Sequence, residues 1–404
     1  MATTKIKQQS GTGKILRFAH PFFTKIPAEE RTVVPGVGQR MIDFIATKLL
    51  PFPDPQREPV MMLADIIGQK GVGEIELNKS ITFHAVGDTG HENGHMQELV
   101  AEAMALDYNP ALPAKSPAFF LHLGDVIYYD NTDKGYQAQF YVPYKRYPGK
   151  IIAIPGNHDG EIFKFDGTPT GQKTSLAAFW RNFCQPKPGV PPDAGTIYRE
   201  MVSQPGAYWW LDAPFVDIIG LYSNIGEGPG FISVATLGGF KQTDWLTKTL
   251  TTIRKRRDKG VRKALVVAVH HPPFSNGGHS SSVEMMTDMD ACFTKGGIMP
   301  DAVLAAHAHN YQRFTRYNAA GGKNSQTPYY VVGTGGRGTI NVQQATGIRT
   351  GDHSYDSSLM GYGYLTVTAN PKQLILSFTQ VALSGAKTIF DKKITVDLAT
   401  NKII

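Results

Sequence analysis

The sequence predicts an α/β fold whose core alternates strands with helices and whose C-terminal part consists mainly of strands. From about residue 81 onward, short apolar runs end repeatedly in a glycine or a polar cluster, which is typical of buried strands. These runs are ITFHAVGD, AFFLHLGD, KIIAIPGN, FVDIIGLYS, KALVVAVHH and AVLAAHAH. Apolar residues keep helical spacing between several of them, at 96–106 and 244–257. After about Tyr329, the runs YYVVG, GYLTVTA, QLILSFTQ and KKITVDL predict strands that extend or face the first sheet.

Length and composition allow one elaborated domain or two. The 404 residues are 41% hydrophobic, so the chain can bury a large core and disorder throughout is excluded. Residues 1–78, with PFPDPQREP in the middle, indicate an irregular N-terminal extension packed on the core. The main domain then spans 79–404, with a loop-rich insertion at about 160–206 and the strand-rich C-terminal part.

The net charge of +7 favours anionic ligands, but such an excess is also common on soluble proteins of this length. The basic run RKRRDKGVRK at 254–263 lies at the end of a predicted helix, where cations complement the helix dipole. We favour this structural role over a nucleic-acid patch, so no nucleic acid is expected as a structural partner.

Cys184 and Cys292 are too few for a disulfide scaffold and make at most one bridge. The N-terminus is positively charged but lacks an apolar stretch long enough for a signal peptide, and no run of about 18 apolar residues occurs. No membrane span is therefore expected. The location stays open: the cytoplasm is slightly favoured, and a periplasmic or secreted location follows if a leader has been removed. The oligomeric state is also open.

The ends of the predicted strands carry the most unusual residues. In sheets that alternate with helices, ligands gather outside the carboxyl ends of the strands. In chain order these ends supply Asp88, Asp125, Tyr128, Asn157, His158, His270, His307 and His309. Each motif is weak alone, because Gly-Asp is often a turn and a lone histidine is usually a core or surface residue. Five such motifs in order, each closing an apolar strand, predict a metal site at one edge.

The stretch GDTGHENGH at 87–95 contains a competing motif, since His91 to His95 fits H-E-x-x-H, the zinc-protease pattern. That pattern requires a helix, and Gly94 inside it disfavours a helix by about 1 kcal/mol. Asp88 is therefore the predicted ligand, and His91 or His95 at most faces the substrate.

A second competing motif, GTGGRG at 333–338, matches GxGxxG after a strand. The residues that follow do not indicate a long helix, so a dinucleotide site is disfavoured. We expect a tight loop near the metal edge, where glycine lets the backbone approach substrate or ligands. His84 and His122 lie inside strands and are expected to be hydrogen-bonded core residues.

These motifs together resemble the metallophosphoesterase, or calcineurin-like phosphoesterase, superfamily, whose pattern is an early aspartate, GD, GNH, a strand-end histidine and GHxH. Tyr128, three residues after Asp125, makes GDxxY, which looks like the purple acid phosphatase branch. His279, nine residues after His270, falls where that branch has a substrate-facing histidine. The resemblance covers about residues 81–340. It implies a four-layer α/β/β/α sandwich of two packed mixed sheets flanked by helices, with a dinuclear metal site at the C-terminal edge of the strands.

The resemblance also implies two metal ions bridged by Asp125. One would be held by Asp88, Asp125, Tyr128 and His309, the other by Asp125, Asn157, His270 and His307. Carboxylate and phenolate oxygens suit a trivalent iron, whereas imidazoles and an amide oxygen suit a divalent ion. The implied cofactor is Fe(III) with a divalent Fe, Zn or Mn.

Two departures from the family pattern occur. Ala306 stands where the family usually has glycine before His307, and His271 separates His270 from Pro272. Neither removes a ligand donor. We favour His270 as the ligand from its spacing, which leaves His271 beside the ligands or on the surface.

The expected function is hydrolysis of a phosphate monoester on a small phosphorylated substrate, as in acid phosphatases. A metal-bound hydroxide would attack phosphorus in line, and His158 and His279 would donate hydrogen bonds or a proton to the departing group. The alternative is a phosphodiesterase acting on nucleotide or phospholipid-type substrates with the same centre. A non-catalytic metal-binding protein of this fold is a further alternative, disfavoured because the full ligand set is present. A phosphoserine or phosphothreonine protein phosphatase is disfavoured because Val126, Ile127 and Tyr128 follow Asp125 where that branch has acidic and arginine residues.

Overall fold

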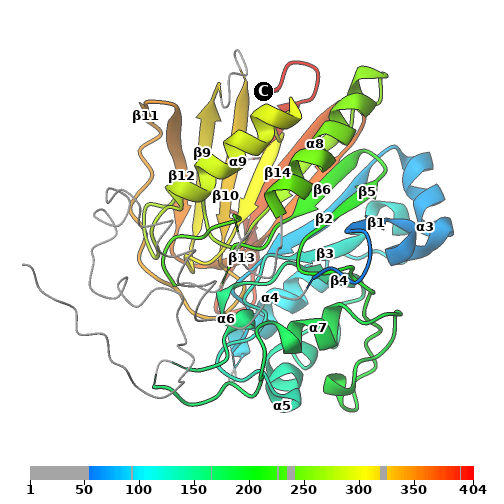
Figure 1. Ribbon diagram of the computed structural model, residues 1–404, viewed down its shortest axis with the longest axis vertical. Helices are drawn as coiled ribbons and strands as arrows, with labels where there is room; N and C mark the ends of the chain where they lie inside the picture. Colours follow the sequence, from blue (N-terminus) through cyan, green and yellow to red (C-terminus); the bar gives the residue numbers. More distant parts are fainter. Residues whose placement is uncertain are drawn as a thin grey trace, which may run out of the picture.

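The computed structural model describes residues 54–91, 94–164, 166–224, 227–233, 242–318, 325–391 and 393–404. In this part of the chain two β-sheets pack face to face, and helices cover their outer faces (Figure 1). The expected four-layer α/β/β/α architecture is confirmed.

The first sheet has nine strands within the described residues. Their order is β1 (Val60–Met62), β5 (Trp209–Ala213), β6 (Val216–Gly220), β7 (Ala264–Ala268), β8 (Ala302–Ala305), β10 (Gln326–Val332), β9 (Tyr311–Tyr317), β12 (His353–Leu359) and β11 (Arg349–Thr350). The central strands β6, β7, β8 and β10 run parallel to one another, whereas β9 is antiparallel to both of its neighbours, β10 and β12. The sheet is therefore mixed, with a parallel centre.

The second sheet joins early and late segments of the chain. Its order is β17 (Lys402–Ile403), β16 (Ile394–Asp397), β14 (Gln373–Val381), β13 (Tyr362–Ala369), β2 (Ile81–Val86), β3 (Phe119–His122) and β4 (Lys150–Ala153), with β15 (Lys387–Ile389) paired to β14. Strands β2, β3 and β4 are parallel, and β13 is antiparallel to β2. Of the late strands predicted from the sequence, β13, β14 and β16 extend the sheet that contains β2, and β10 belongs to the nine-stranded sheet that faces it.

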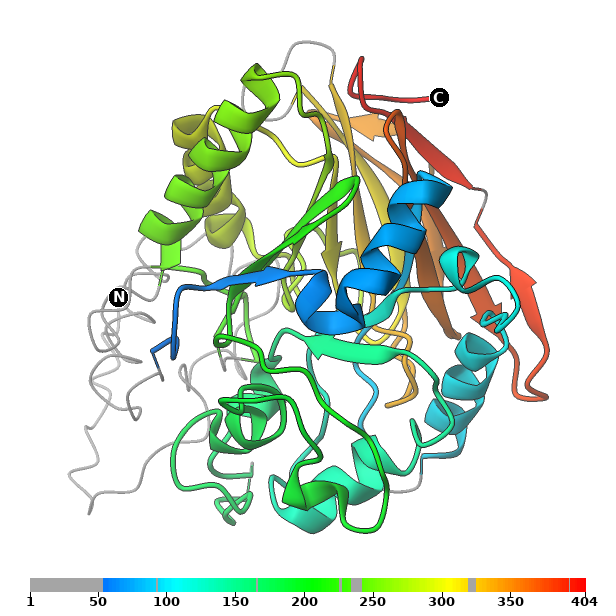
Figure 2. The same ribbon diagram turned by 90° about the vertical axis from the view of Figure 1, so that its right-hand side faces the viewer.

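Alternation along the strands explains the layers. Leu265 and Val267 of β7 pack with Leu250 of α8 (Gln242–Asp258), whereas Val266 and Ala268 belong to the core between the sheets. α9 (Val283–Gly296) lies beside α8 on this outer face. On the other side, α4 (His95–Ala105) packs against β13 and β14. Figure 2 shows α8 and α9 on one side of the paired sheets and α4 on the other.

Shorter elements connect the strands. They are η2 (Pro113–Lys115), α5 (Asp133–Tyr136), η3 (Gln137–Tyr141), α6 (Asn157–Gly160), α7 (Ala177–Phe183) and η4 (Pro192–Ala194). The insertion at 160–206 contains α7 and η4 and is otherwise built of loops and isolated bridges. Its loop-rich character agrees with the sequence.

The irregular character expected of residues 1–78 is wrong for residues 60–78. Val60–Met62 form β1, which pairs in parallel with β5, and α3 (Ala64–Asn78) follows. Gly68 has a left-handed φ of 75° that kinks this helix, and it is one of three glycines that hide the helical pattern in the sequence. Residues 1–53, which make up most of the expected extension, lie outside the described residues.

The basic run at 254–263 is tied to acidic side chains. Arg256 bonds Asp212 and Asp217, and Arg262 bonds Asp301, so these cations join α8 and the start of β7 to neighbouring strands. The pairs are partly buried, which supports a structural role for the run.

Both cysteines are buried free thiols. The helices in the described part of the chain are all too short or too polar to cross a membrane.

Candidate metal centre

The predicted site residues follow strands of both sheets at a common edge. Asp88, Asp125 and Asn157 come after β2, β3 and β4, and His270 and His307 come after β7 and β8. All five strands are parallel within their own sheets, so their carboxyl ends meet where the two sheets face each other. Residues separated by more than two hundred positions therefore converge.

Three groups of described side chains offer metal-ligating atoms within 4.8 Å of one another; His158, Glu161 and Glu227 form one of them, and the predicted ligands form the other two. One contains Asp125, His270 and His307, and the other contains Asp88, Asp125 and His309. Asp125 belongs to both groups, as expected of a residue that bridges two ions. The structure thus brings together the histidines and carboxylates that the sequence singled out.

Tyr128 and Asn157 complete these groups. The Tyr128 hydroxyl lies 3.2 Å from Asp88 Oδ1 and 2.9 Å from His309 Nε2. Asn157 Oδ1 lies 3.1 Å from His270 Nε2. The side chain of Gln139, in η3, bonds both the backbone N–H and the carbonyl of Tyr128, which fixes the tyrosine at the site.

Hydrogen bonding leaves lone pairs directed into the centre. His270 has Nδ1 2.8 Å from the Leu123 carbonyl oxygen, a contact that directs its Nε2 into the centre, 3.3 Å from Asp125 Oδ2. Asp88 Oδ2, Asp125 Oδ2 and His307 Nε2 are buried and have no hydrogen-bond partner among the described residues. Buried polar atoms are rarely left in this state. A cation is the partner that fits such a set of acceptors, so the residues present fit a metal centre.

The backbone at the ligands adopts an uncommon conformation. Asp88, Asp125, His307 and His309 have left-handed φ values of 54°, 53°, 69° and 49°. Residues other than glycine rarely adopt this left-handed backbone conformation. It persists where the surrounding structure enforces it, often at functional sites. The turn after each strand therefore aims its ligand at the cost of local strain.

The GTGGRG loop lies against Asp88. A Cβ on Gly333 would stand 2.3 Å from Asp88 Oδ2, so a side chain is not tolerated there. The N–H groups of Gly335 and Arg337 donate to the carbonyls of Gly87 and Asp88, each at 3.0 Å. This is the tight loop at the metal edge that the sequence predicted.

His158 and His279 lie beside the ligands. The backbone N–H of His158 donates to Asp125 Oδ1 at 2.9 Å, and the His279 ring centroid is 4.1 Å from that of His307. His158 Nδ1 is also 3.0 Å from Glu161 Oε2, and its Nε2 is 3.6 Å from Glu227 Oε1.

Sequence reasoning missed three residues of this site, Glu161, Glu227 and Arg337. Glu161 follows His158 by three residues in a short helical turn, a spacing that could have indicated the contact. Glu227 lies in the loop after β6, where no motif marks it. The Arg337 guanidinium lies 4.4 Å from the Tyr128 ring centroid. Its loop was predicted at this edge, but the role of its side chain was not.

Burial and neighbouring charges set the protonation of the imidazoles. Burial acts to lower the pKa of His270, but the Asp125 carboxylate outweighs it and raises that pKa to about 9. Burial lowers the pKa of His309 to about 3 and that of His307 well below its ordinary value, with neighbouring histidines acting in the same direction. A neutral imidazole is the form that binds a cation, so His307 and His309 are ready to act as ligands.

His158 is held in the opposite state. Burial would lower its pKa, but the carboxylates of Glu161 and Asp125 outweigh burial and raise the pKa well above its ordinary value. A protonated His158 can donate a hydrogen bond from its ring to an anionic substrate.

The two departures from the family pattern are accommodated locally. The Ala306 methyl fills space beside Gly87, where an added Cβ would come within 2.6 Å of it. His271 is buried, with Nδ1 2.7 Å from Ser223 Oγ and its ring centroid 4.3 Å from that of His307. It therefore packs beside the ligands rather than on the surface.

The remaining histidines have structural positions. His84 lies 3.1 Å from Asp107 Oδ2, and His122 lies 2.8 Å from Thr89 Oγ1; both are buried in strands, as expected. α4 begins at His95, so His91 precedes the helix, and the described residues place neither histidine in a metal-binding group. Glu92 of the H-E-x-x-H motif lies outside the described residues.

Residues 81–311, more than half of the chain, match the family described as calcineurin-like phosphoesterase. The chain is a calcineurin-like phosphoesterase. The candidate ligands, from Asp88 to His309, all lie within the matched residues.

Solved structures share the fold of this phosphoesterase. It is similar to the purple acid phosphatase PPD1 from yellow lupin (Lupinus luteus) seeds, with 14% identity and a TM-score of 0.52 over 79% of this chain and 54% of that one. It is also similar to GAP50, described as the anchor in the inner membrane complex of Plasmodium, with 11% identity and a TM-score of 0.50 over 79% of this chain and 88% of that one. The phosphoesterase spans about half the length of the lupin protein. No curated protein gives a match.

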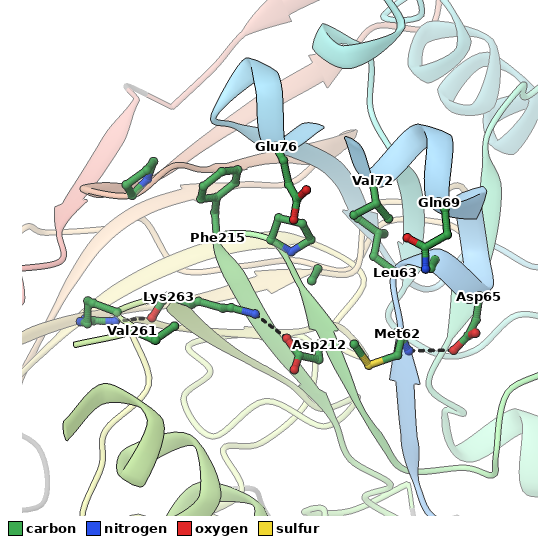
Figure 3. A pocket seen from close by; sticks show the side chains of 15 residues that line it. Met62, Leu63, Asp65, Gln69, Val72, Glu76, Asp212, Phe215, Val261 and Lys263 are labelled. Carbon is green, nitrogen blue, oxygen red and sulfur yellow. Dashed lines mark hydrogen bonds and ion pairs between the residues drawn. The ribbon is translucent and has the colours of Figure 1, made fainter. Parts of the chain in front are cut away.

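A separate hollow of about 610 Å³ lies at the opposite edge of the strands (Figure 3). It is bordered by Leu63 and Val72, by Phe215 before β6, and by Lys263 before β7. Two charged residues of its lining, Lys263 and Asp212, form an ion pair with each other. The hollow lacks the convergent ligands of the metal edge and is not the catalytic site.

Proposed function

We propose that this phosphoesterase hydrolyses phosphate monoesters with two metal ions. Asp88, Asp125, Tyr128 and His309 would hold one ion, and Asp125, Asn157, His270 and His307 the other. The observation that carries the proposal is the pair of ligand groups that share Asp125, with unpartnered acceptor atoms directed between them. When bound, the ions would polarise a phosphoryl oxygen and lower the pKa of a water molecule.

The protein's own groups would bind and orient the ester. Protonated His158, held by Glu161, would donate from Nε2 to a phosphoryl oxygen or to the departing oxygen. His279, beside His307, would donate a second hydrogen bond. Tyr128 supplies an oxygen donor that suits Fe(III), with a divalent Fe, Zn or Mn as the second ion. The likeness in fold to the lupin purple acid phosphatase supports the acid-phosphatase subtype.

Metal content and the visible spectrum of the purified protein test the centre. We expect two ions per chain and a violet colour from Fe(III) bound to the Tyr128 phenolate. The Asp125→Asn variant should lose most of both ions and reduce kcat by at least about 10²-fold, because it removes the shared ligand. Asp258→Asn, which alters an exposed ion pair with Arg254, is the control.

Rates on p-nitrophenyl phosphate and bis-p-nitrophenyl phosphate decide between a monoesterase and a phosphodiesterase. A higher kcat/KM for the monoester supports the proposal, and the reverse order assigns the diesterase. A protein that binds two ions but hydrolyses neither compound would be a non-catalytic member of the family.

A further inference from the structure

Arg337 is brought to the metal edge by its backbone. It lies in the loop after β10, where Gly333 and Gly335 let the chain pass close to Asp88 and Gly87. The Arg337 N–H donates to the Asp88 carbonyl at 3.0 Å. The position of this side chain is therefore coupled to that of a candidate ligand.

The guanidinium lies over aromatic rings. Its central carbon is 4.4 Å from the ring centroid of Tyr128 and 5.3 Å from that of Tyr129. Contact with the ring face orients the cation and leaves the N–H donors at its rim unused. Tyr129, half-buried with a left-handed φ of 61°, is held beside Tyr128 and His158.

Arg337 lacks the acidic partners that several buried or half-buried arginines have, and differs from the buried Arg199, whose guanidinium donates to backbone carbonyls. Arg256, Arg313 and Arg316 bond carboxylates at 2.7, 2.6 and 2.6 Å. In the described part of the chain, no carboxylate lies within 4.0 Å of the Arg337 guanidinium. A positioned cation beside an anion-binding centre is thus left available to a ligand.

The position of the Arg337 guanidinium also indicates which anionic group it would contact. The Tyr128 hydroxyl is directed to Asp88 and His309, whereas the guanidinium lies over the face of the same ring. Arg337 is therefore displaced sideways from the ligand atoms, over the ring of Tyr128. Its planar fork matches a carboxylate or phosphate.

We propose that Arg337 binds a second anionic group of the substrate, a carboxylate or a further phosphate, beside the phosphoryl group that is hydrolysed. The preferred substrates are then phosphate monoesters that carry this additional negative charge. This inference rests on the proposed monoesterase function and adds the class of substrate.

A matched pair of esters tests the inference in the metal-loaded enzyme. The pair is 4-carboxyphenyl phosphate and its methyl ester, which differ mainly in the second charge. We expect the wild type to favour the carboxylate and Arg337→Gln to reduce that preference about tenfold or more, mainly through KM. Arg337→Lys, which keeps the charge without the fork, should fall between them. Benzene-1,4-bisphosphate in the same series shows whether phosphate or carboxylate is the better second group.

Arg349→Gln is the control, because Arg349 also lies over a tyrosine ring, 4.2 Å from the Tyr317 centroid, but is exposed in β11. It should leave the preference unchanged. An equal loss of kcat/KM on both esters in Arg337→Gln would overturn the inference, since the arginine would then serve the reacting phosphoryl group or only support Tyr128.

Calorimetric binding separates this inference from the proposed function. The probes are 4-carboxybenzylphosphonate and benzylphosphonate, which are not hydrolysed. Tighter binding of the carboxylate by the wild type, lost in Arg337→Gln, supports the anion subsite even if neither ester turns over. Equal affinities in both proteins refute the subsite whether or not the enzyme is a monoesterase.

Discussion

At the metal edge, the imidazole ring of His158 is held in place by neighbouring carboxylates. His158 has one ring nitrogen 3.0 Å from the buried Glu161 and the other 3.6 Å from the partly exposed Glu227, so its orientation depends on both carboxylates. Donation to a departing oxygen matters most when that oxygen is a poor leaving group. Glu161 is therefore a positioning residue whose importance should vary with the substrate.

The Glu161→Gln variant tests this role. We expect kcat to fall about tenfold or more on phenyl phosphate and much less on p-nitrophenyl phosphate, with metal content unchanged, because the variant loosens His158 without removing a ligand. Steady-state kinetics on the two esters measure the difference.

Glu200→Gln serves as its control, because Glu200 makes a partly exposed ion pair with Lys150. Equal losses of kcat on both esters would argue that Glu161 supports the fold of the site and not the donation by His158.

At the residue scale, the candidate ligands could be proposed from the sequence because each of them except Tyr128 lies within two to four positions of a strand end, inside a short motif. Asp88 and His307 are of this kind. Glu227 and Arg337 were not readable as site residues, since their distance from the centre depends on the path of loops after β6 and β10. A loop's path is set by tertiary contacts, which one sequence does not display.

At the scale of elements, Asp107 links three strands of the second sheet to the end of α4. It follows α4 and accepts hydrogen bonds from His84 of β2, Tyr364 of β13 and Lys387 of β15. Burial alone would raise its pKa, but these three donors outweigh burial and lower the pKa to about 2. The ionised carboxylate therefore stabilises the folded state.

The Asp107→Asn variant should lower the free energy of unfolding by about 1–3 kcal/mol at pH 7. The folded-state pKa lies below that of an unfolded aspartate, near 3.9. The stabilisation is thus complete above about pH 5 and is lost as the pH falls towards 2. Denaturant unfolding of both proteins between pH 7 and pH 3 should show the gap narrowing, and a gap that stays constant would contradict this account.

Helices and strands could be predicted where apolar residues recur with regular spacing. The prediction failed where glycine interrupts that spacing. Strand β7 is an uninterrupted apolar run, and β2 and β3 are mainly apolar, with Thr82, His84 and His122 as their polar residues. The helix α8 keeps its helical spacing. α3 carries three glycines and a kink, and β1 has only three residues, so neither has a pattern of its own. Pairing with β5 and burial of Ile66 and Ile75 decide their structure.

At the scale of the whole molecule, the residues that match the family end earlier in the chain than the residues that build the two sheets. The match ends at residue 311, yet β13 pairs with β2 along five residues, from Leu365 with Ala85 to Ala369 with Ile81. Without β13, one edge of β2 and the core beneath it would be exposed. The C-terminal strand β13 is therefore part of the same sheet as the matched strand β2.

Truncation after residue 311 should give a protein that is insoluble or lacks a cooperative thermal transition, because β2 would become an unprotected edge. Truncation after residue 400 removes only the two-residue strand β17 and should leave a soluble, cooperative protein. Solubility and circular dichroism melts compare the two. A folded, metal-binding product from the shorter chain would show that the late strands are dispensable.

The left-handed turns at Asp88, Asp125, His307 and His309 have a consequence for exchange of the ions. Since these turns follow strands that are held by backbone pairing within the sheets, stripping by a chelator should leave the far-ultraviolet spectrum nearly intact. Reloading should then proceed without refolding. One preparation could in this way be refilled with iron, zinc or manganese in turn, so that each ion's effect on rate is compared in an otherwise identical scaffold.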